Sequence, residues 1–145
     1  MVTSGRHRVR ADPSRLDLLL WVLTALSAAL TLVFSFGLDP PRVGGFRHAD
    51  KVWHGLAYFT TTLLFLLAAV WRPGRGAGAF PRAGIVFALL GSAAGGVVEI
   101  AQGSTATRDP EVLDWVADVL GILAALGVIV ALRALTDGPT DSPPS

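Results

Sequence analysis

The chain has 145 residues, of which 52% are hydrophobic and 16% are charged, and its mean hydropathy is +0.55. A soluble domain of this length is ordinarily less apolar. The net charge is only +1 and no basic stripe is interleaved with aromatic residues, so we expect no nucleic-acid partner. Cysteine is absent, which excludes a disulfide framework and a thiolate metal site. The composition therefore predicts a membrane protein.

Long uncharged runs alternate with short charged clusters along the chain, a pattern typical of membrane-spanning helices. Residues 18–38 and 52–71 are each long enough to cross the hydrocarbon layer, which takes about 20 helical residues. The uncharged runs at 83–98 and 119–132 are shorter. They reach a full span only if carboxylates occupy the last turn of the third helix and the first turns of the fourth.

We therefore predict an all-α fold, a polytopic bundle of four transmembrane helices over about residues 17–38, 52–71, 83–102 and 112–133. The four helices form one domain, residues 16–133. A basic arm precedes this domain at residues 1–15. A tail rich in Pro, Ser and Asp follows it at residues 134–145, and we expect this tail to be disordered.

The basic residues predict the orientation of the bundle. Eight of the twelve lie on the side of the two termini, and four lie on the opposite side. The positive-inside rule then predicts that both termini are cytoplasmic. The alternative is that the first apolar run is a cleaved signal peptide, because Ser35-Phe36-Gly37 is a small-x-small triplet after a basic start. That run is longer than the roughly 7 to 15 residues of a signal-peptide core, which favours a retained helix.

Polar residues gather in three short segments that this topology places at the outer face of the membrane. One opens the second helix, one closes the third, and one precedes and opens the fourth. They are Asp50, Lys51, His54 and Tyr58; Glu99 and Gln102; and Arg108, Asp114 and Asp118. Spacings of three or four residues put polar residues of the same helix on one face. Each charged side chain costs about 2.5 to 3.5 kcal/mol in hydrocarbon, so we expect these faces to meet one another or an aqueous pocket.

Small residues predict where the helices pack closely. Gly91 and Gly95 form a G-x-x-x-G pattern in the third helix, and Ala117, Gly121 and Ala125 recur every four residues in the fourth. Such faces let two backbones approach. We interpret them as a contact between the third and fourth helices rather than as a dimer interface. That contact would set Glu99 of the third helix against Asp118 of the fourth.

The ordered set of polar residues resembles the VanZ-like family of membrane proteins. The resemblance covers about residues 50–130 and rests on D-K-x-x-H-x-x-x-Y, then E-x-x-Q, then R followed by D-x-x-x-[N/D]-x-x-G. Asp118 departs from the family, which more often has Asn there. The resemblance implies a four-helix protein of the bacterial cytoplasmic membrane, in a family named for a member linked to low-level teicoplanin resistance. It also implies kinship with membrane enzymes that act on lipid head groups.

The polar residues have catalytic and structural interpretations. The candidate catalytic residues are His54, Glu99, Asp114 and Asp118. His54 would be a base, an acid, a nucleophile or a metal ligand, and Glu99 and Asp114 would orient it or hold a metal. The candidate substrate-binding residues, with Arg108 suited to gripping a phosphate, are Lys51, Tyr58, Gln102 and Arg108. Asp50 is a candidate cap of the second helix. In the structural interpretation, Lys51 snorkels to the interface, His54 bonds a neighbouring helix and Arg108 is a counterion.

The three buried carboxylates, those of Glu99, Asp114 and Asp118, leave negative charge in excess. Protonation, a bound divalent cation or a cationic ligand would relieve it.

Three functions fit these residues. The first is an enzyme that hydrolyses or exchanges the head group of a phospholipid or lipid carrier in the outer leaflet. The second is a non-catalytic binder of a lipid-linked envelope precursor or a lipoglycopeptide antibiotic. Both make membrane lipids or lipid-linked precursors the expected partners. The third, a proton-coupled carrier, fits least because the polar groups lie at one end of the helices and no inverted repeat is visible.

Overall fold

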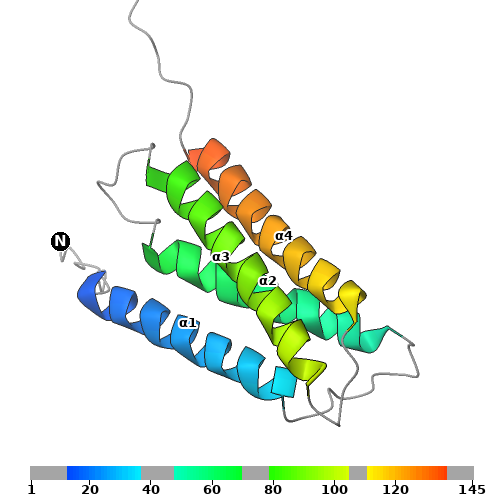
Figure 1. Ribbon diagram of the computed structural model, residues 1–145. Coiled ribbons are helices and arrows are strands. Elements are labelled where there is room, and N and C mark those ends of the chain that lie inside the picture. The colour runs from blue at the N-terminus through cyan, green and yellow to red at the C-terminus, as the bar shows by residue number, and fades with distance from the viewer. Residues whose placement is uncertain (1–12, 37–47, 70–78, 105–110, 137–145) are drawn as a thin grey trace, which may run out of the picture.

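The computed structural model of the chain describes residues 13–36, 48–69, 79–104 and 111–136. These residues form four α-helices and no strand; the helices are α1 (Pro13–Phe36), α2 (Ala49–Ala69), α3 (Ala79–Gln102) and α4 (Val112–Thr136) (Figure 1). Each helix has the length and the apolar composition to cross a membrane. The predicted all-α fold with four membrane-spanning helices is confirmed, and the chain is a multi-pass membrane protein.

All four helices extend beyond the predicted spans at one end, α2 and α3 by beginning at Ala49 and Ala79. α1 begins at Pro13, inside the predicted arm, and proline is favoured in a first helical turn because the N–H it lacks would be unpaired there. α4 continues to Thr136, inside the predicted tail, and has Arg133 in its last turn, where a cation is favourable. The rest of the arm and of the tail, with the disorder predicted for the tail, lies outside the described residues.

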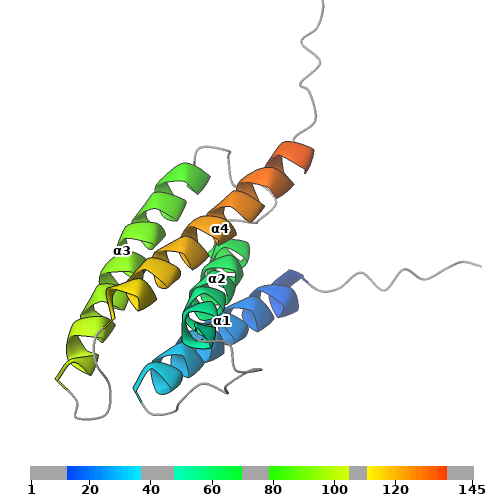
Figure 2. The same cartoon turned by 90° about the vertical axis from the view of Figure 1, so that its right-hand side faces the viewer.

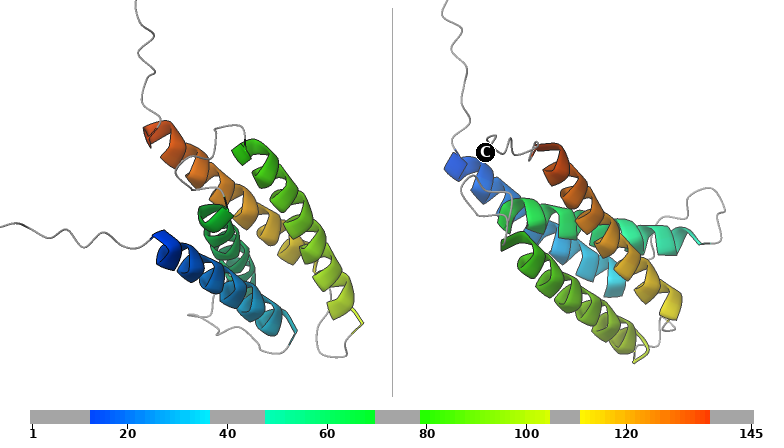
Figure 3. Two further views of the ribbon diagram at one scale, coloured as in Figure 1. Left: turned by 90° about the vertical axis from the view of Figure 1, so that its left-hand side faces the viewer. Right: turned by 90° about the horizontal axis from the view of Figure 1, so that it is seen from above.

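The helices pack in the order α1, α2, α4, α3. The contact of α2 with α4 is the most extensive, followed by those of α1 with α2 and of α3 with α4. Figures 2 and 3 show α1 and α3 at the two outer positions of this row. Consecutive helices run in opposite directions (Figure 1). The C-terminal ends of α1 and α3 therefore share one end of the bundle with the N-terminal ends of α2 and α4.

Apolar side chains cover the outside of the bundle, and ionisable side chains are buried inside it. Ile100 is 75% exposed and Leu89 is 66% exposed, whereas Asp118 is only 1% exposed. A soluble protein has the opposite distribution, because water favours charged groups at the surface and apolar groups inside. Lipid around the helices explains the arrangement, since hydrocarbon accepts apolar surface and excludes unpaired charge.

The apolar core occupies the half of the bundle that holds the C-terminal parts of α2 and α4. Leu66 of α2 and Ile129 of α4 are almost completely buried in one cluster. Phe65 stacks on Phe87 of α3 with ring centroids 4.1 Å apart, and Trp21 of α1 meets Phe65 edge-on at 5.8 Å. These contacts tie all four helices together and leave the opposite half of the bundle for polar groups.

Glycines let α4 approach both of its neighbours. Gly91 and Gly95 of α3 lie against side chains of α4, so their predicted contact with the fourth helix is confirmed. The prediction was wrong for the small residues of α4, which were expected to face α3. Gly121 packs against the backbone of Gly55 in α2, and Gly55 in turn faces the carbonyl of Ala117. The physical reason is that α2, not α3, is the main neighbour of α4, and small residues permit close approach without selecting the partner.

Candidate functional site

The buried ionisable and amide side chains gather where α2 and α4 begin and α3 ends. They are His54, Glu99, Gln102, Asp114 and Asp118, and each is at most 8% exposed. These residues come from three segments that are far apart in the sequence, and the antiparallel order of the helices brings the segments to one end of the bundle. A buried polar group needs a partner, so the contacts of each one are informative.

His54 and Asp118 meet beside the close contact of α2 with α4. The Nδ1 atom of His54 lies 3.0 Å from Oδ1 of Asp118, which is hydrogen-bond distance. With the carboxylate ionised, Nδ1 is the donor in this bond, because an ionised carboxylate can only accept. The bond fixes the orientation of the imidazole ring.

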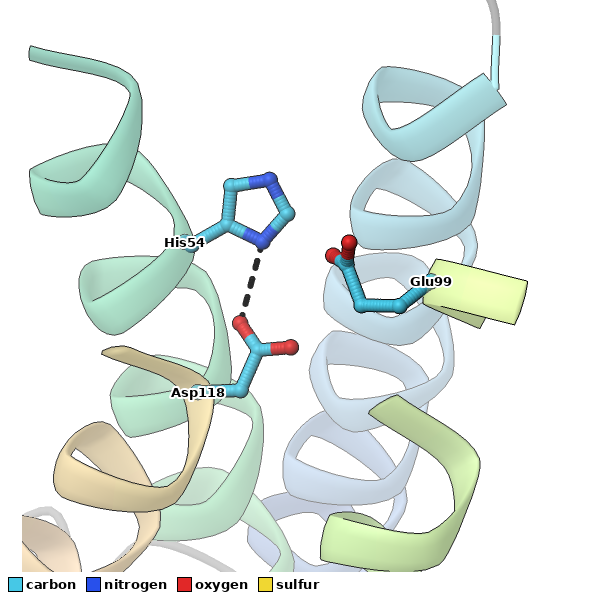
Figure 4. Close-up of side chains that lie close together, drawn as sticks. All are labelled: His54, Glu99 and Asp118. Carbon is cyan, nitrogen blue, oxygen red and sulfur yellow. Dashed lines mark hydrogen bonds and ion pairs between the residues drawn. The ribbon is translucent and has the colours of Figure 1, made fainter. Parts of the chain in front are cut away.

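Glu99 of α3 points toward this pair, as Figure 4 shows. Its Oε2 accepts the backbone N–H of Glu111 at 3.1 Å, which ties α3 to the start of α4. Its Oε1 is buried and has no hydrogen-bond partner among the described residues. A ring nitrogen of His54 and one carboxylate oxygen each of Glu99 and Asp118 all lie within 4.8 Å of one another. We call these three residues the His54 cluster.

A second group of carboxylates surrounds Lys51. The Nζ atom of Lys51 lies 2.7 Å from Asp50 and 2.6 Å from Asp114, and it also contacts the carboxylate of Glu111. We call these four residues the Lys51 cluster. Asp114 connects it to the His54 cluster, because Asp114 Oδ2 lies 3.8 Å from His54 Nε2. One cation thus holds three carboxylates at the start of α2 and α4.

The other residues predicted for the site have different surroundings. Gln102 donates from Nε2 to a backbone carbonyl of α1 at 2.5 Å, so its amide links α3 to α1. Tyr58 is half-buried and lines a cavity between α1 and α2, and its hydroxyl lies against Gly95 of α3, as does Asp118 Oδ2. Asp50, predicted to cap the second helix, is in the first turn of α2. Arg108 lies outside the described residues.

Glu111 was not among the residues predicted for the site, although it belongs to the Lys51 cluster and anchors Glu99. One signal could have identified it. Glu111 precedes Asp114 by three residues, which puts the two carboxylates on one face at the start of the predicted helix. A lysine facing that helix end from α2 would then be expected to contact both.

An apolar cavity of about 490 Å³ lies between α1 and α2, and His54 lies in its wall. Leucine, phenylalanine and alanine side chains such as Leu30, Phe34 and Ala57 form much of the rest. Leu30 and Phe34 are 47% and 44% exposed, so this wall continues into the lipid-facing surface of α1. The cavity therefore runs from the exposed apolar surface of α1 to His54.

This end of the bundle combines an oriented imidazole, a buried carboxylate with a free oxygen, and an apolar cavity. An imidazole held by a carboxylate can transfer protons, and mixed imidazole and carboxylate groups can bind metal ions. Comparisons of the chain with protein-family models, with curated proteins and with solved structures found no match.

Proposed function

We propose that this chain is a VanZ-like membrane protein that holds the tail of a lipid or lipid-linked molecule between α1 and α2 and acts on its head group at the His54 cluster. The observation that carries the proposal is that His54 belongs both to the polar cluster and to the wall of the apolar cavity. A lipid has the same division between an apolar tail and a polar head. Binding sites with apolar walls and a few convergent polar groups are typical of ligand pockets.

An enzyme is favoured over a passive binder because of how His54 is held. Hydrolysis or transfer of a head group needs a side chain that accepts and returns a proton, and histidine does this near neutral pH. The 3.0 Å contact with Asp118 fixes the imidazole ring, as carboxylates do for catalytic histidines. Recognition alone would not require an imidazole oriented in this way.

A proton-coupled carrier is less well supported. It would need titratable groups along a path through the membrane. In the described spans, the half of the bundle beyond the His54 cluster is filled by the apolar core around Leu66 and Ile129.

The cellular location is part of the same proposal. The residues that match the VanZ-like pattern support the bacterial cytoplasmic membrane and a role in the cell envelope. The eight basic residues on the side of the termini support cytoplasmic termini. The His54 cluster would then act on the outer leaflet, where envelope lipids and lipoglycopeptide antibiotics are found.

The test uses the full chain in nanodiscs that contain head-group-labelled phospholipids and lipid-linked precursors, with and without Mg²⁺ or Mn²⁺. We expect release or exchange of one head group, lost in His54→Ala and retained in His48→Ala. His48 is the matched control because it is exposed and does not line the cavity. Retention of one lipid by both variants without turnover would contradict the catalytic part and favour the binder. The absence of both binding and turnover for every lipid tested would contradict the proposal as a whole.

A further inference from the structure

The His54 cluster holds one carboxylate oxygen that its hydrogen bonds leave unused. Asp118 is engaged by His54, and Glu99 is fixed through Oε2 by the N–H of Glu111. Glu99 is only 6% exposed, and Oε1 has no partner in the described part of the chain. Figure 4 shows this carboxylate directed toward the space beside His54 and Asp118. An unpaired buried carboxylate oxygen is costly, so the arrangement indicates a ligand between the three side chains.

The geometry of the cluster fits a metal ion. Transition-metal ions bind imidazole nitrogen and carboxylate oxygen at about 2.0 to 2.2 Å, so two ligands of one ion are about 3 Å apart at an octahedral angle and about 3.4 Å apart at a tetrahedral angle. His54 Nδ1 and Asp118 Oδ1 are separated by 3.0 Å, and an ion bound by both atoms would take the place of the proton between them. The ligand atoms of all three residues lie within 4.8 Å of one another, so the third one must move closer to the other two to bind the same ion.

The charges of the two clusters distinguish them. Asp50, Glu111 and Asp114 also lie within 4.8 Å of one another, but Lys51 Nζ contacts all three and supplies a cation. Within the described residues, the carboxylates of Glu99 and Asp118 have only His54 as a basic neighbour. With a neutral imidazole the His54 cluster carries two negative charges, which one divalent cation neutralises.

We propose that the His54 cluster binds one divalent transition-metal ion, Zn²⁺ or Mn²⁺, through a ring nitrogen of His54 and a carboxylate oxygen from each of Glu99 and Asp118. The imidazole favours these ions over Mg²⁺ and Ca²⁺, which prefer oxygen ligands alone. One outer partner is in place, because the Glu111 N–H holds Glu99, whereas Asp114 lies 3.8 Å from the other ring nitrogen of His54, beyond hydrogen-bond distance.

What the ion does there rests on the proposed function. A bound metal ion lowers the pKa of a coordinated water and polarises a phosphoryl oxygen, as head-group hydrolysis requires. With the ion bound, His54 would hold the ion, and the proton transfer that the proposed function assigns to His54 would pass to the coordinated water. Binding of the ion itself does not depend on which lipid is the substrate.

The experiment measures metal binding without any lipid turnover. Purified full-length protein in lipid nanodiscs is stripped with a chelator, dialysed against Zn²⁺ or Mn²⁺, and analysed for metal per chain. We expect one ion per wild-type chain and an affinity at least about tenfold lower in Glu99→Gln. Asp50→Asn is the matched control, because it neutralises a carboxylate of the Lys51 cluster that makes no contact with the His54 cluster. It should bind the ion like the wild type.

Three results would overturn the inference. They are a wild-type chain that retains no ion, equal affinity in Glu99→Gln and wild type, and loss of the ion in Asp50→Asn but not in Glu99→Gln. If Glu99→Gln fails to fold, the wild-type Mn²⁺ complex keeps the test decisive, since its electron spin echo must show coupling to an imidazole nitrogen that disappears in His54→Gln. Head-group turnover by metal-free protein would show that the reaction does not need the ion, and it would leave the proposed function standing. Bound metal without turnover on any lipid would support the metal site and contradict the proposed function.

Discussion

His54 of α2 and Asp118 of α4 are 64 residues apart in the sequence, and their side chains meet at 3.0 Å. The meeting depends on the close approach of the two helices at Gly55 and Gly121, neighbours of the two residues along their helices. The polar chemistry of the protein is thus coupled to backbone packing. Changes to either should affect the other in ways that can be measured separately.

Replacing Asp118 by Asn tests whether its charge or its shape matters. The amide has nearly the same shape, so we expect the thermal unfolding temperature in detergent to change little. Loss of an anionic ligand should lower Zn²⁺ affinity about tenfold or more, measured by dialysis and metal analysis. Asp50→Asn, which changes a carboxylate of the Lys51 cluster, is the control and should bind normally. Wild-type affinity in Asp118→Asn would mean that Asp118 only orients His54.

Lys51 is expected to be important for stability. Its removal leaves three carboxylates close together, of which Asp114 is buried. Breaking a partly buried ion pair such as that of Lys51 with Asp114 costs roughly 3 kcal/mol of unfolding free energy. Lys51→Ala should therefore unfold at a much lower denaturant concentration, as measured by circular dichroism in micelles. Asp114→Asn in the same chain should restore part of the loss by removing one of the repelling charges. Arg82→Ala is the control, because Arg82 is exposed and lies at the start of the third span.

A fully stable Lys51→Ala protein would contradict this account. It would mean that the carboxylates at the start of α2 and α4 are screened by water or protonated, and that Lys51 snorkels without holding the helices together.

The number of helices and their approximate bounds could be predicted because hydrocarbon imposes a length that composition reveals directly. The packing partner of each helix could not. Gly121 and Ala117 predict that another helix packs closely against α4, but a small residue does not indicate which helix that is. Only the tertiary arrangement shows that α2 lies between α1 and α4.

The site was predictable to the extent that charge is costly in a membrane. His54, Glu99 and Asp118 were expected to meet because none of them can face lipid, and they do meet. The role of Gln102 could not be inferred, since its bond to a backbone carbonyl of α1 has no sequence signature. Glu111 was missed because it lies just before the helix, where a carboxylate is ordinarily solvated.

Gly121→Ala should separate α2 from α4. A Cβ at residue 121 would overlap the backbone carbonyl of Gly55, which cannot rotate away as a side chain can. Overpacking of this kind costs roughly 1 to 3 kcal/mol, so we expect a clear drop in the unfolding temperature and, because His54 adjoins Gly55, weaker metal binding. Gly127→Ala is the matched control in the same helix, since nothing lies within 4 Å of its added Cβ. Equal stability of the two variants would show that α2 and α4 approach each other less closely than the structure shows.

Gly95→Ala should disturb the site more than the fold. Its Cβ would lie 2.9 Å from Asp118 Oδ2 and 3.3 Å from the Tyr58 hydroxyl, so the Asp118 side chain must move. We expect metal affinity or head-group turnover to fall several-fold, with a stability loss of about 1 kcal/mol or less. Gly96→Ala is the control, because its Cβ would meet only Trp115 at 3.6 Å or more. If both variants behave alike, the Asp118 side chain has room that the structure does not indicate.

Ala57→Trp separates the cavity from the polar cluster. Ala57 lines the cavity between α1 and α2, and an indole there fills space that we assign to a lipid tail. Lipid binding or head-group turnover should fall about tenfold or more, equivalent to about 1.4 kcal/mol, measured in nanodiscs with the labelled lipid panel. Zn²⁺ affinity should stay at the wild-type value, because Ala57 is not part of the His54 cluster. Leu89→Trp, on the lipid-facing surface of α3, controls for an added tryptophan. Unchanged turnover in Ala57→Trp would mean that the substrate reaches His54 from the aqueous side, and that the cavity is only a lipid-filled gap between helices.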